Sequence, residues 1–170
     1  MELLTRILKR EPSSSTKTKH PGLSFYRPIK YYDFHVYYFN HNKKSREEAL
    51  TLRQKLFHDF PNYAEEGSII VKIRRQEDVI GPHPTQFWEV DVRRPEVFLE
   101  LLGWFQVHHG NLPVLIHPQT GNDVEDHSRL ALWLGDRLPL FFDQLPESAG
   151  IPEFGVLGGQ RRDPEEFDKN

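Results

Sequence analysis

The chain has 170 residues, with 37% hydrophobic and 28% charged side chains and a formal net charge of −3, which suits one folded domain. Basic residues are scattered and do not outnumber acidic ones, so we expect no nucleic-acid partner. Because the chain has no cysteine and no long apolar run, we expect no disulfide, no thiolate metal ligand and no membrane association, and a cytoplasmic location.

Composition divides the chain into a lead-in, a domain and a tail. Residues 1–28 are polar and rich in Ser, Thr and Lys, which predicts a flexible lead-in. Residues 146–170 are rich in Pro, Gly and charged side chains, which predicts a C-terminal tail. We therefore expect a single domain over residues 29–145.

Hydrophobic periodicity predicts four strands and two helices in this domain. Alternation over residues 31–39 is typical of a strand and places Asp33, His35 and Tyr37 on one face. The six elements are expected as a strand at 31–39, a helix from a capping box at Ser45 and Glu48 to the residue before Pro61, strands at 68–74 and 86–92, a helix from Pro95 that stops at Gly110, and a strand at 113–117.

The order β-α-β-β-α-β is typical of a ferredoxin-like fold in the α+β class. By analogy with that fold, the strand order is 4-1-3-2, which places the first and fourth strands side by side and antiparallel. After this unit we expect a short helix at 128–134 and one extra strand at 138–142.

Four histidines border the predicted strands, namely His35, His83, His117 and His127. Because imidazole is the commonest protein ligand for Zn, Fe, Ni and Cu, this pattern indicates a metal centre on the sheet. His117 can approach His35 across the paired strands, and His127 follows through a short turn-rich segment. His83 emerges at the opposite end of the sheet, so it must cross the sheet face or come from a second subunit.

Other interpretations of these residues stay open. A single histidine on a strand is more often a hydrogen-bonded, half-buried side chain than a metal ligand. Asp33, Glu89 and Asp126 are candidate orienting partners or a carboxylate ligand, although surface charge is the more ordinary interpretation of Asp33. The chain has no GxxxxGK[ST] or GxSxG motif, which argues against a nucleotide site or a serine hydrolase.

Several motifs over residues 30–142 resemble the DOPA 4,5-dioxygenase family of small extradiol dioxygenases. These motifs are His35-Val-Tyr-Tyr38, GPHP at 81–84, PVLIHP at 113–118 and TG-(x)₄-DH at 120–127. The resemblance implies a ferredoxin-like homodimer that opens the ring of a catechol such as L-DOPA with O₂ at a non-haem Fe(II), for which Zn can substitute. Many relatives carry a histidine where this chain has Asp33, so the substrate here can differ.

On this resemblance, the expected Fe(II) ligands are His35, His83 and His117. His127 is then expected to act as the acid/base, with Asp126 orienting its ring. The aromatic side chains of Tyr37 and Trp88 are expected to line the substrate pocket, and Arg129 to hold a substrate carboxylate. The alternatives are a catalytically inactive dimeric ligand-binding module and a Zn-dependent hydrolase that uses the same histidines.

Overall fold

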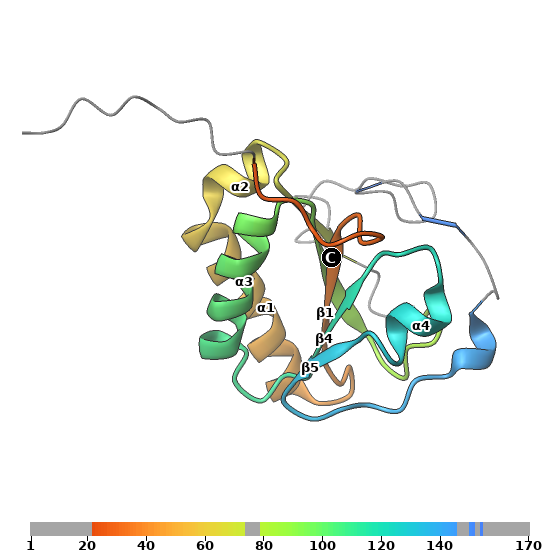
Figure 1. The fold of residues 1–170 in the computed structure, drawn as a ribbon. Coiled ribbons are helices and arrows are strands. Elements are labelled where there is room, and N and C mark those ends of the chain that lie inside the picture. The colour runs from red at the N-terminus through yellow and green to blue at the C-terminus, as the bar shows by residue number, and fades with distance from the viewer. Residues whose placement is uncertain (1–21, 74–78, 146–149, 152–153, 155–170) are drawn as a thin grey trace, which may run out of the picture.

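A five-stranded sheet separates two layers in the described part of the chain (Figure 1). The computed structural model describes residues 22–73, 79–145, 150–151 and 154. Two long helices, α1 (Lys43–Asp59) and α3 (Pro95–His108), cover one face of the sheet. The short helix α4 (Asp123–His127) and neighbouring loops lie over the other face. The chain is therefore an α+β protein.

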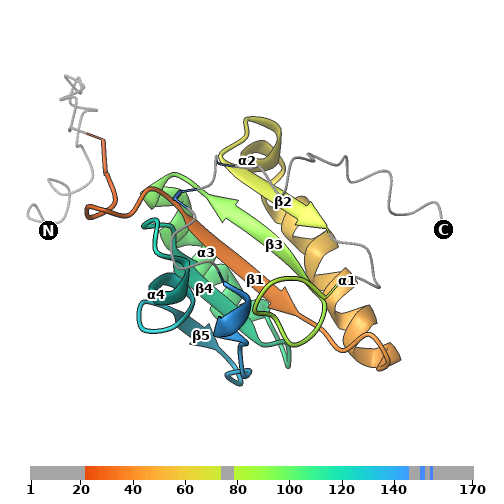
Figure 2. The same cartoon turned by 90° about the vertical axis from the view of Figure 1, so that its right-hand side faces the viewer.

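The strands pair in the order β2-β3-β1-β4-β5, and each pairing is antiparallel (Figure 2). They are β1 (Tyr32–Tyr37), β2 (Ile69–Ile73), β3 (Phe87–Val92), β4 (Val114–Pro118) and β5 (Leu132–Leu134). The first four strands thus have the order that the sequence predicted. β1 is central, and Asp33 lies opposite Asp91 on one side and His117 on the other.

Alternation along the strands sorts apolar from polar side chains between the two faces. Phe34 and Val36 of β1 point toward the helices and pack with Leu56 of α1 and with Leu101 and Phe105 of α3. These side chains are fully buried, so they supply much of the hydrophobic stabilisation of the domain. The opposite face carries the polar residues, which α1 and α3 do not cover.

The first helix begins earlier than the predicted capping box. Asn42 is the N-cap, because its side-chain oxygen accepts a hydrogen bond from the backbone N–H of Ser45 at 3.2 Å. The hydroxyl of Ser45 instead accepts a hydrogen bond from the backbone N–H of Phe39 at 3.0 Å. A short helix that the sequence did not predict, α2 (Pro61–Glu65), follows α1. It begins at a proline, which is well suited to the first position of a helix.

The elements predicted after β4 are wrong in position. The helix expected at 128–134 is replaced by α4, whose N-cap Asn122 accepts a hydrogen bond from Glu125 N–H at 3.1 Å. The extra strand is β5 and not residues 138–142, because Leu132 and its neighbours pair with β4 whereas Pro139 has no N–H for a strand ladder. A 3₁₀ turn at Phe142–Gln144 follows.

The two ends of the chain are described in part only. Residues 22–28 form no helix or strand, but Phe25 packs edge-on against Tyr32 and Phe98 with centroid distances of 5.1 and 5.8 Å. The rest of the predicted lead-in, and most of the predicted tail at 146–170, lie outside the described residues. The folded unit therefore includes at least one aromatic side chain ahead of residue 29.

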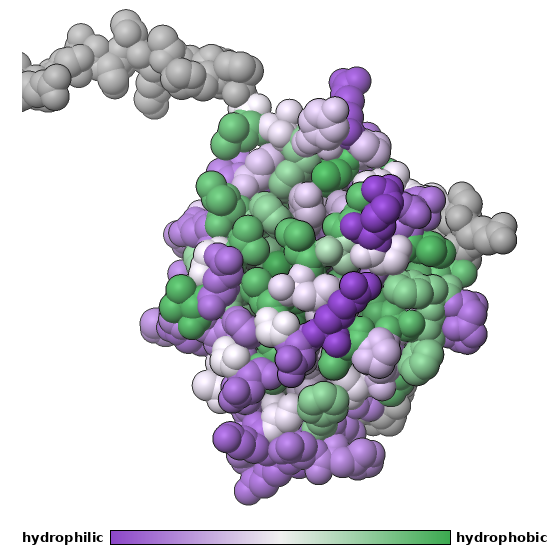
Figure 3. Space-filling model, turned by 60° about the horizontal axis from the view of Figure 1, so that its bottom comes forward, coloured by the Kyte–Doolittle hydropathy of each residue, from purple (hydrophilic) through white to green (hydrophobic). Residues whose placement is uncertain are grey.

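Apolar side chains also remain at the surface. On the face seen in Figure 3, green hydrophobic areas are interrupted by purple hydrophilic residues. Large exposed apolar residues include Val79, Ile80 and Phe141. The backbone N–H of Phe141 donates to the Pro82 carbonyl at 2.8 Å, so exposed apolar residues flank the segment that carries His83.

Replacing the N-cap tests the start of α1. We expect Asn42→Ala to lower the free energy of unfolding by about 1 kcal/mol, because it removes the acceptor for the Ser45 N–H. Asn42→Asp keeps an acceptor and should stay close to wild type. Urea denaturation measures both, and equal stability of Asn42→Ala and wild type would contradict this cap.

Candidate metal centre

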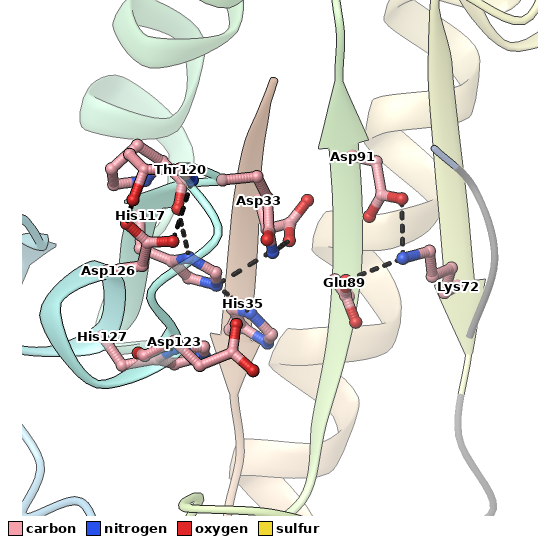
Figure 4. Close-up of polar contacts among 12 residues, drawn as sticks. Asp33, His35, Lys72, Glu89, Asp91, His117, Thr120, Asp123, Asp126 and His127 are labelled. Atoms are coloured by element: carbon pink, nitrogen blue, oxygen red, sulfur yellow. Dashed lines mark hydrogen bonds and ion pairs between the residues drawn. The ribbon is translucent and has the colours of Figure 1, made fainter. Parts of the chain in front are cut away.

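Four buried histidines converge on the face of the sheet opposite α1 and α3. They come from the middle of β1, the loop before β3, the end of β4 and the end of α4, and three of them are labelled in Figure 4. The His35 ring centroid lies 4.6 Å from that of His83, 5.0 Å from His117 and 5.9 Å from His127. The centroids of His117 and His127 are 3.9 Å apart. His35, His117 and His127 lie together as predicted, and His83 joins them.

His35 and His117 lie within hydrogen-bonding distance of each other. Their Nε2 atoms are 2.9 Å apart, as the pairing of β1 with β4 allows. The Nδ1 of His117 lies 3.0 Å from the Pro118 carbonyl oxygen. A carbonyl oxygen only accepts, so His117 Nδ1 carries the proton and its Nε2 presents a lone pair. Among the described residues, the buried Nδ1 of His35 has no hydrogen-bond partner.

His83 reaches the cluster from its own chain. The loop before β3 folds back over the sheet face, where the Thr85 hydroxyl donates to the Tyr38 carbonyl at 2.9 Å. The Tyr38 N–H in turn donates to the Gln86 carbonyl at 3.0 Å. His83 Nδ1 is 2.7 Å from the hydroxyl of Tyr37, which is also on the site face. The loop therefore crosses the sheet, and no second subunit is needed to deliver this imidazole.

The ring of His127 is oriented by a backbone carbonyl and not by Asp126 as predicted. His127 Nδ1 donates to the Asp123 carbonyl at 2.9 Å, which leaves a lone pair on Nε2. The carboxylate of Asp126 instead accepts hydrogen bonds from the Thr120 N–H at 2.9 Å and the Thr120 hydroxyl at 2.6 Å. Asp126 thus anchors the turn that brings α4 to the sheet.

A row of buried charged groups continues from the histidines across the sheet (Figure 4). The ammonium of Lys72 on β2 lies 2.9 Å from a Glu89 oxygen and 2.6 Å from an Asp91 oxygen. Asp33 accepts a hydrogen bond from the Gln119 amide at 2.5 Å, and the same oxygen is 3.8 Å from His117 Nε2. Asp33 is only 3% exposed, so its interpretation as surface charge is wrong.

Burial disfavours the charged forms of these groups, so it lowers the pKa of a histidine and raises the pKa of a carboxyl group. It lowers the pKa of His35, of His117 and of His127, the last to about 3. Burial, followed by repulsion from Glu89, raises the pKa of Asp33 to about 7. Lys72 keeps its charge, because attraction from neighbouring carboxylates raises its pKa although burial acts in the opposite direction.

Three groups of side chains could each hold a metal ion, because the ligand atoms within each group all lie within 4.8 Å of one another. One is His35, His83 and His127; a second is Asp33, His35 and His117; a third is Asp33, Glu89 and Asp91. The first differs from the predicted ligand set by one histidine. In the third, Lys72 already provides a cation. His35 belongs to both groups that contain imidazole.

The donor atoms fit a first-row divalent metal. Adjacent nitrogen ligands of an octahedral ion at about 2.1 Å lie roughly 3.0 Å apart, close to the 2.9 Å between the two Nε2 atoms of His35 and His117. His117, whose Nδ1 donates to the Pro118 carbonyl, has the form that is usual for histidine ligands. In the described part of the chain, Asp33 Oδ1 is buried without a hydrogen-bond partner. A bound cation would satisfy this oxygen.

Two predicted substrate residues do not reach the cluster. Trp88 lies on the opposite face, in the core with Phe105, because alternation along β3 places it away from Glu89. Arg129 is mostly exposed and pairs with Glu125 at 2.6 Å. Tyr37 is the predicted substrate residue that does lie on the site face.

Sequence reasoning missed four residues around the site, namely Lys72, Asp91, Gln119 and Trp133. Lys72 and Asp91 could have been found from the sequence, because each is a charged residue within an apolar strand. The alternation along its strand places each of them on this face. Gln119 and Trp133 lie in segments whose path depends on the turn before α4 and on the unpredicted strand β5. No local pattern marks them.

The fold and the site define this chain as an α+β protein with a candidate metal centre of imidazole and carboxylate ligands on an antiparallel sheet. The model of the Dopa 4,5-dioxygenase family matches residues 32–144. The chain belongs to this family.

Similar proteins come from fungi and from a cyanobacterium. The chain is 32% identical over 117 residues to an uncharacterized 21.2 kDa protein of Botryotinia fuckeliana and 30% identical over 127 residues to the DOPA 4,5-dioxygenase of Amanita muscaria. These matches cover 64% and 73% of this chain, and 60% and 54% of the relatives. A solved structure from Nostoc punctiforme, provisionally described as a dioxygenase, has a TM-score of 0.57 and 30% identity, and the match covers 68% of this chain and 90% of that one.

No helix in the described ranges has both the length and the apolar character needed to cross a bilayer.

The buried histidines predict a pH-dependent stability difference in the metal-free protein. Between about pH 6.5 and the folded-state pKa of about 3, His127 takes up a proton only in the unfolded state, so its contribution to stability falls as the pH falls. His127→Gln removes this linkage. We expect the free energy of unfolding of the variant, relative to that of wild type, to rise on acidification from about pH 7 to about pH 5. The rise is at most about 1.4 kcal/mol per pH unit.

Urea denaturation of chelator-treated protein measures this difference. His41→Gln, which alters an exposed histidine, is the matched control and should follow wild type at each pH. A difference between His127→Gln and wild type that stays constant with pH would contradict the buried, neutral state of His127.

Proposed function

We propose that the chain is an Fe(II)-dependent extradiol dioxygenase that opens the ring of a catechol such as L-DOPA with O₂. One observation carries the proposal: Asp33, His35 and His117 bring a carboxylate and two imidazoles within 4.8 Å of one another on a buried sheet face. Two histidines and one carboxylate are the ligand set of many non-haem Fe(II) oxygenases. Membership of the Dopa 4,5-dioxygenase family supports the same chemistry.

In this proposal Asp33 takes the place that His83 had in the predicted ligand set. Asp33 is buried beside His117, and Gln119 holds one of its oxygens by a hydrogen bond, which fixes the orientation of the carboxylate. Bound Fe(II) would supply a Lewis-acidic centre with open positions for a catechol and O₂. The negative charge of the carboxylate would also make the binding of a divalent cation more favourable than at a site with uncharged ligands only.

His127 is the group that we assign to proton transfer. Its Nδ1 donates to the Asp123 carbonyl, so the bare Nε2 can accept a proton from a catechol hydroxyl. Its ring lies 3.9 Å from that of His117, next to the proposed ligands but outside their group. Asp123 is a positioning residue through its backbone oxygen, which a side-chain substitution does not remove.

Three further features of the family resemblance remain proposals for this chain. We propose a ferredoxin-like classification on the order of the first four strands, and a cytoplasmic location. We also propose a homodimer, which β5 can support because it is an edge strand with Leu132 exposed. Because the histidines converge within one chain, the chemistry does not require the second copy.

Oxygen consumption tests the function. The protein, reconstituted with Fe(II) under nitrogen, should consume O₂ with catechols and yield ring-opened products that carry both atoms of ¹⁸O₂, measured by an oxygen electrode and mass spectrometry. Zn-loaded protein is the control and should be inactive. Absence of ring opening across a catechol panel with bound iron would contradict the proposal, and turnover without O₂ would favour the hydrolase.

The ligand set is tested by metal affinity. Loss of a residue that hydrogen-bonds to a metal ligand weakens metal binding by roughly 10–100-fold. Because Asp33 and His117 are proposed as ligands themselves, we expect Asp33→Asn and His117→Ala each to weaken Fe(II) binding by more than this. His127→Ala should retain iron and lose activity. Loss of iron from His127→Ala and His83→Ala, with retention in Asp33→Asn, would instead assign the metal to His35, His83 and His127.

A further inference from the structure

Tyr37 and His83 form a buried hydrogen-bonded pair at the edge of the candidate centre. Tyr37 is fully buried, and its ring stacks on that of Trp133 with a centroid distance of 5.7 Å and an interplanar angle of 15°. Its hydroxyl oxygen is 2.7 Å from His83 Nδ1. The His83 ring is in turn packed between the rings of Phe87 and His35, with centroid distances of 4.2 and 4.6 Å.

The phenol is the donor in this pair. A tyrosine hydroxyl carries its proton at neutral pH, so it can donate to the lone pair of a neutral imidazole nitrogen. In the described part of the chain the hydroxyl has one hydrogen-bond partner, which is His83 Nδ1. If Nδ1 carried a proton and donated it, the phenol proton would be buried without an acceptor, which costs free energy. Donation from the phenol satisfies both groups and places the His83 proton on Nε2.

His83 therefore has the opposite tautomer from His117 and His127. The Nδ1 atoms of His117 and His127 face carbonyl oxygens, which only accept, so these rings present bare Nε2 lone pairs. His83 Nδ1 faces a hydroxyl that can donate, so its Nε2 presents an N–H. Two rings are thus suited to bind a metal or accept a proton, and the third is suited to donate a hydrogen bond.

We propose that Tyr37 is a positioning residue that holds His83 in the Nε2–H tautomer, so that His83 donates a hydrogen bond to an oxygen of the substrate instead of binding the metal. This inference rests on the proposed function for the identity of the substrate as a catechol. An anionic catecholate oxygen is the matching acceptor, because hydrogen bonds to charged oxygen are shorter and stronger than those between neutral groups.

Nitrogen-15 NMR of the histidine rings tests the tautomer without turnover. In the whole 170-residue chain, metal-free and Zn-loaded, at about pH 8 where free imidazole is neutral, we expect His83 with a protonated Nε2 and a bare Nδ1. In Tyr37→Phe the preference should be lost. Tyr38→Phe, which alters the tyrosine that follows β1 and packs against the core on the helix side, is the matched control and should leave the His83 signals unchanged.

Two NMR outcomes would overturn the inference. His83 with a protonated Nδ1 in wild type would make the phenol the acceptor, and identical His83 signals in wild type and Tyr37→Phe would remove the positioning role. Both hold whether or not the protein opens catechol rings, so they are separate from failure of the proposed function.

A double-mutant cycle on catechol turnover gives the second measurement. Tyr37→Phe should lower kcat about 10–100-fold with iron content unchanged, as for other supporting hydrogen bonds around metal sites. His83→Gln should lower kcat at least as much, and the double variant should lose no more than His83→Gln alone. Multiplicative losses in the double variant, or loss of iron from His83→Gln, would contradict a shared role as donor.

Discussion

Burial of both faces of the central strand β1 is the constraint on which the site depends. Phe34 and Val36 fill the core against the helices, and this fixes the register that sends Asp33, His35 and Tyr37 to the opposite face. A shift of one residue would put the polar set into the hydrophobic core. The same packing that stabilises the domain therefore also positions the candidate ligands, and no flexible segment has to place His35.

Charge balance explains why this face is suited to a cation. Three buried carboxylates, on Asp33, Glu89 and Asp91, surround one ammonium, on Lys72, so their ionised forms leave two excess negative charges. The neighbouring imidazoles are held neutral by burial. Without a metal, the excess is reduced by protonation, as the raised pKa of Asp33 indicates. A divalent cation beside Asp33 would offset the same charge.

The hydrogen-bond partners of the ring nitrogens divide the histidines into different chemical roles. Identical side chains within a few ångströms of one another become lone-pair or N–H groups according to whether Nδ1 faces a carbonyl or a hydroxyl. Sequence could predict that His35 and His117 meet, because alternation and strand order follow from local patterns. It could not predict the path of the GPHP loop, the burial of Asp33 or the carbonyl that orients His127, because these depend on long-range packing and on turns whose geometry has no local signature.

The location of the metal is the most direct test of the proposed ligand set. A crystal structure of the Fe(II)-loaded protein, with anomalous data collected at the iron edge, would place the ion without reference to activity. We expect one anomalous peak bound by Asp33, His35 and His117, with His83 and His127 outside its ligand set. A peak bound by His35, His83 and His127, or an ion between Asp33, Glu89 and Asp91, would contradict it.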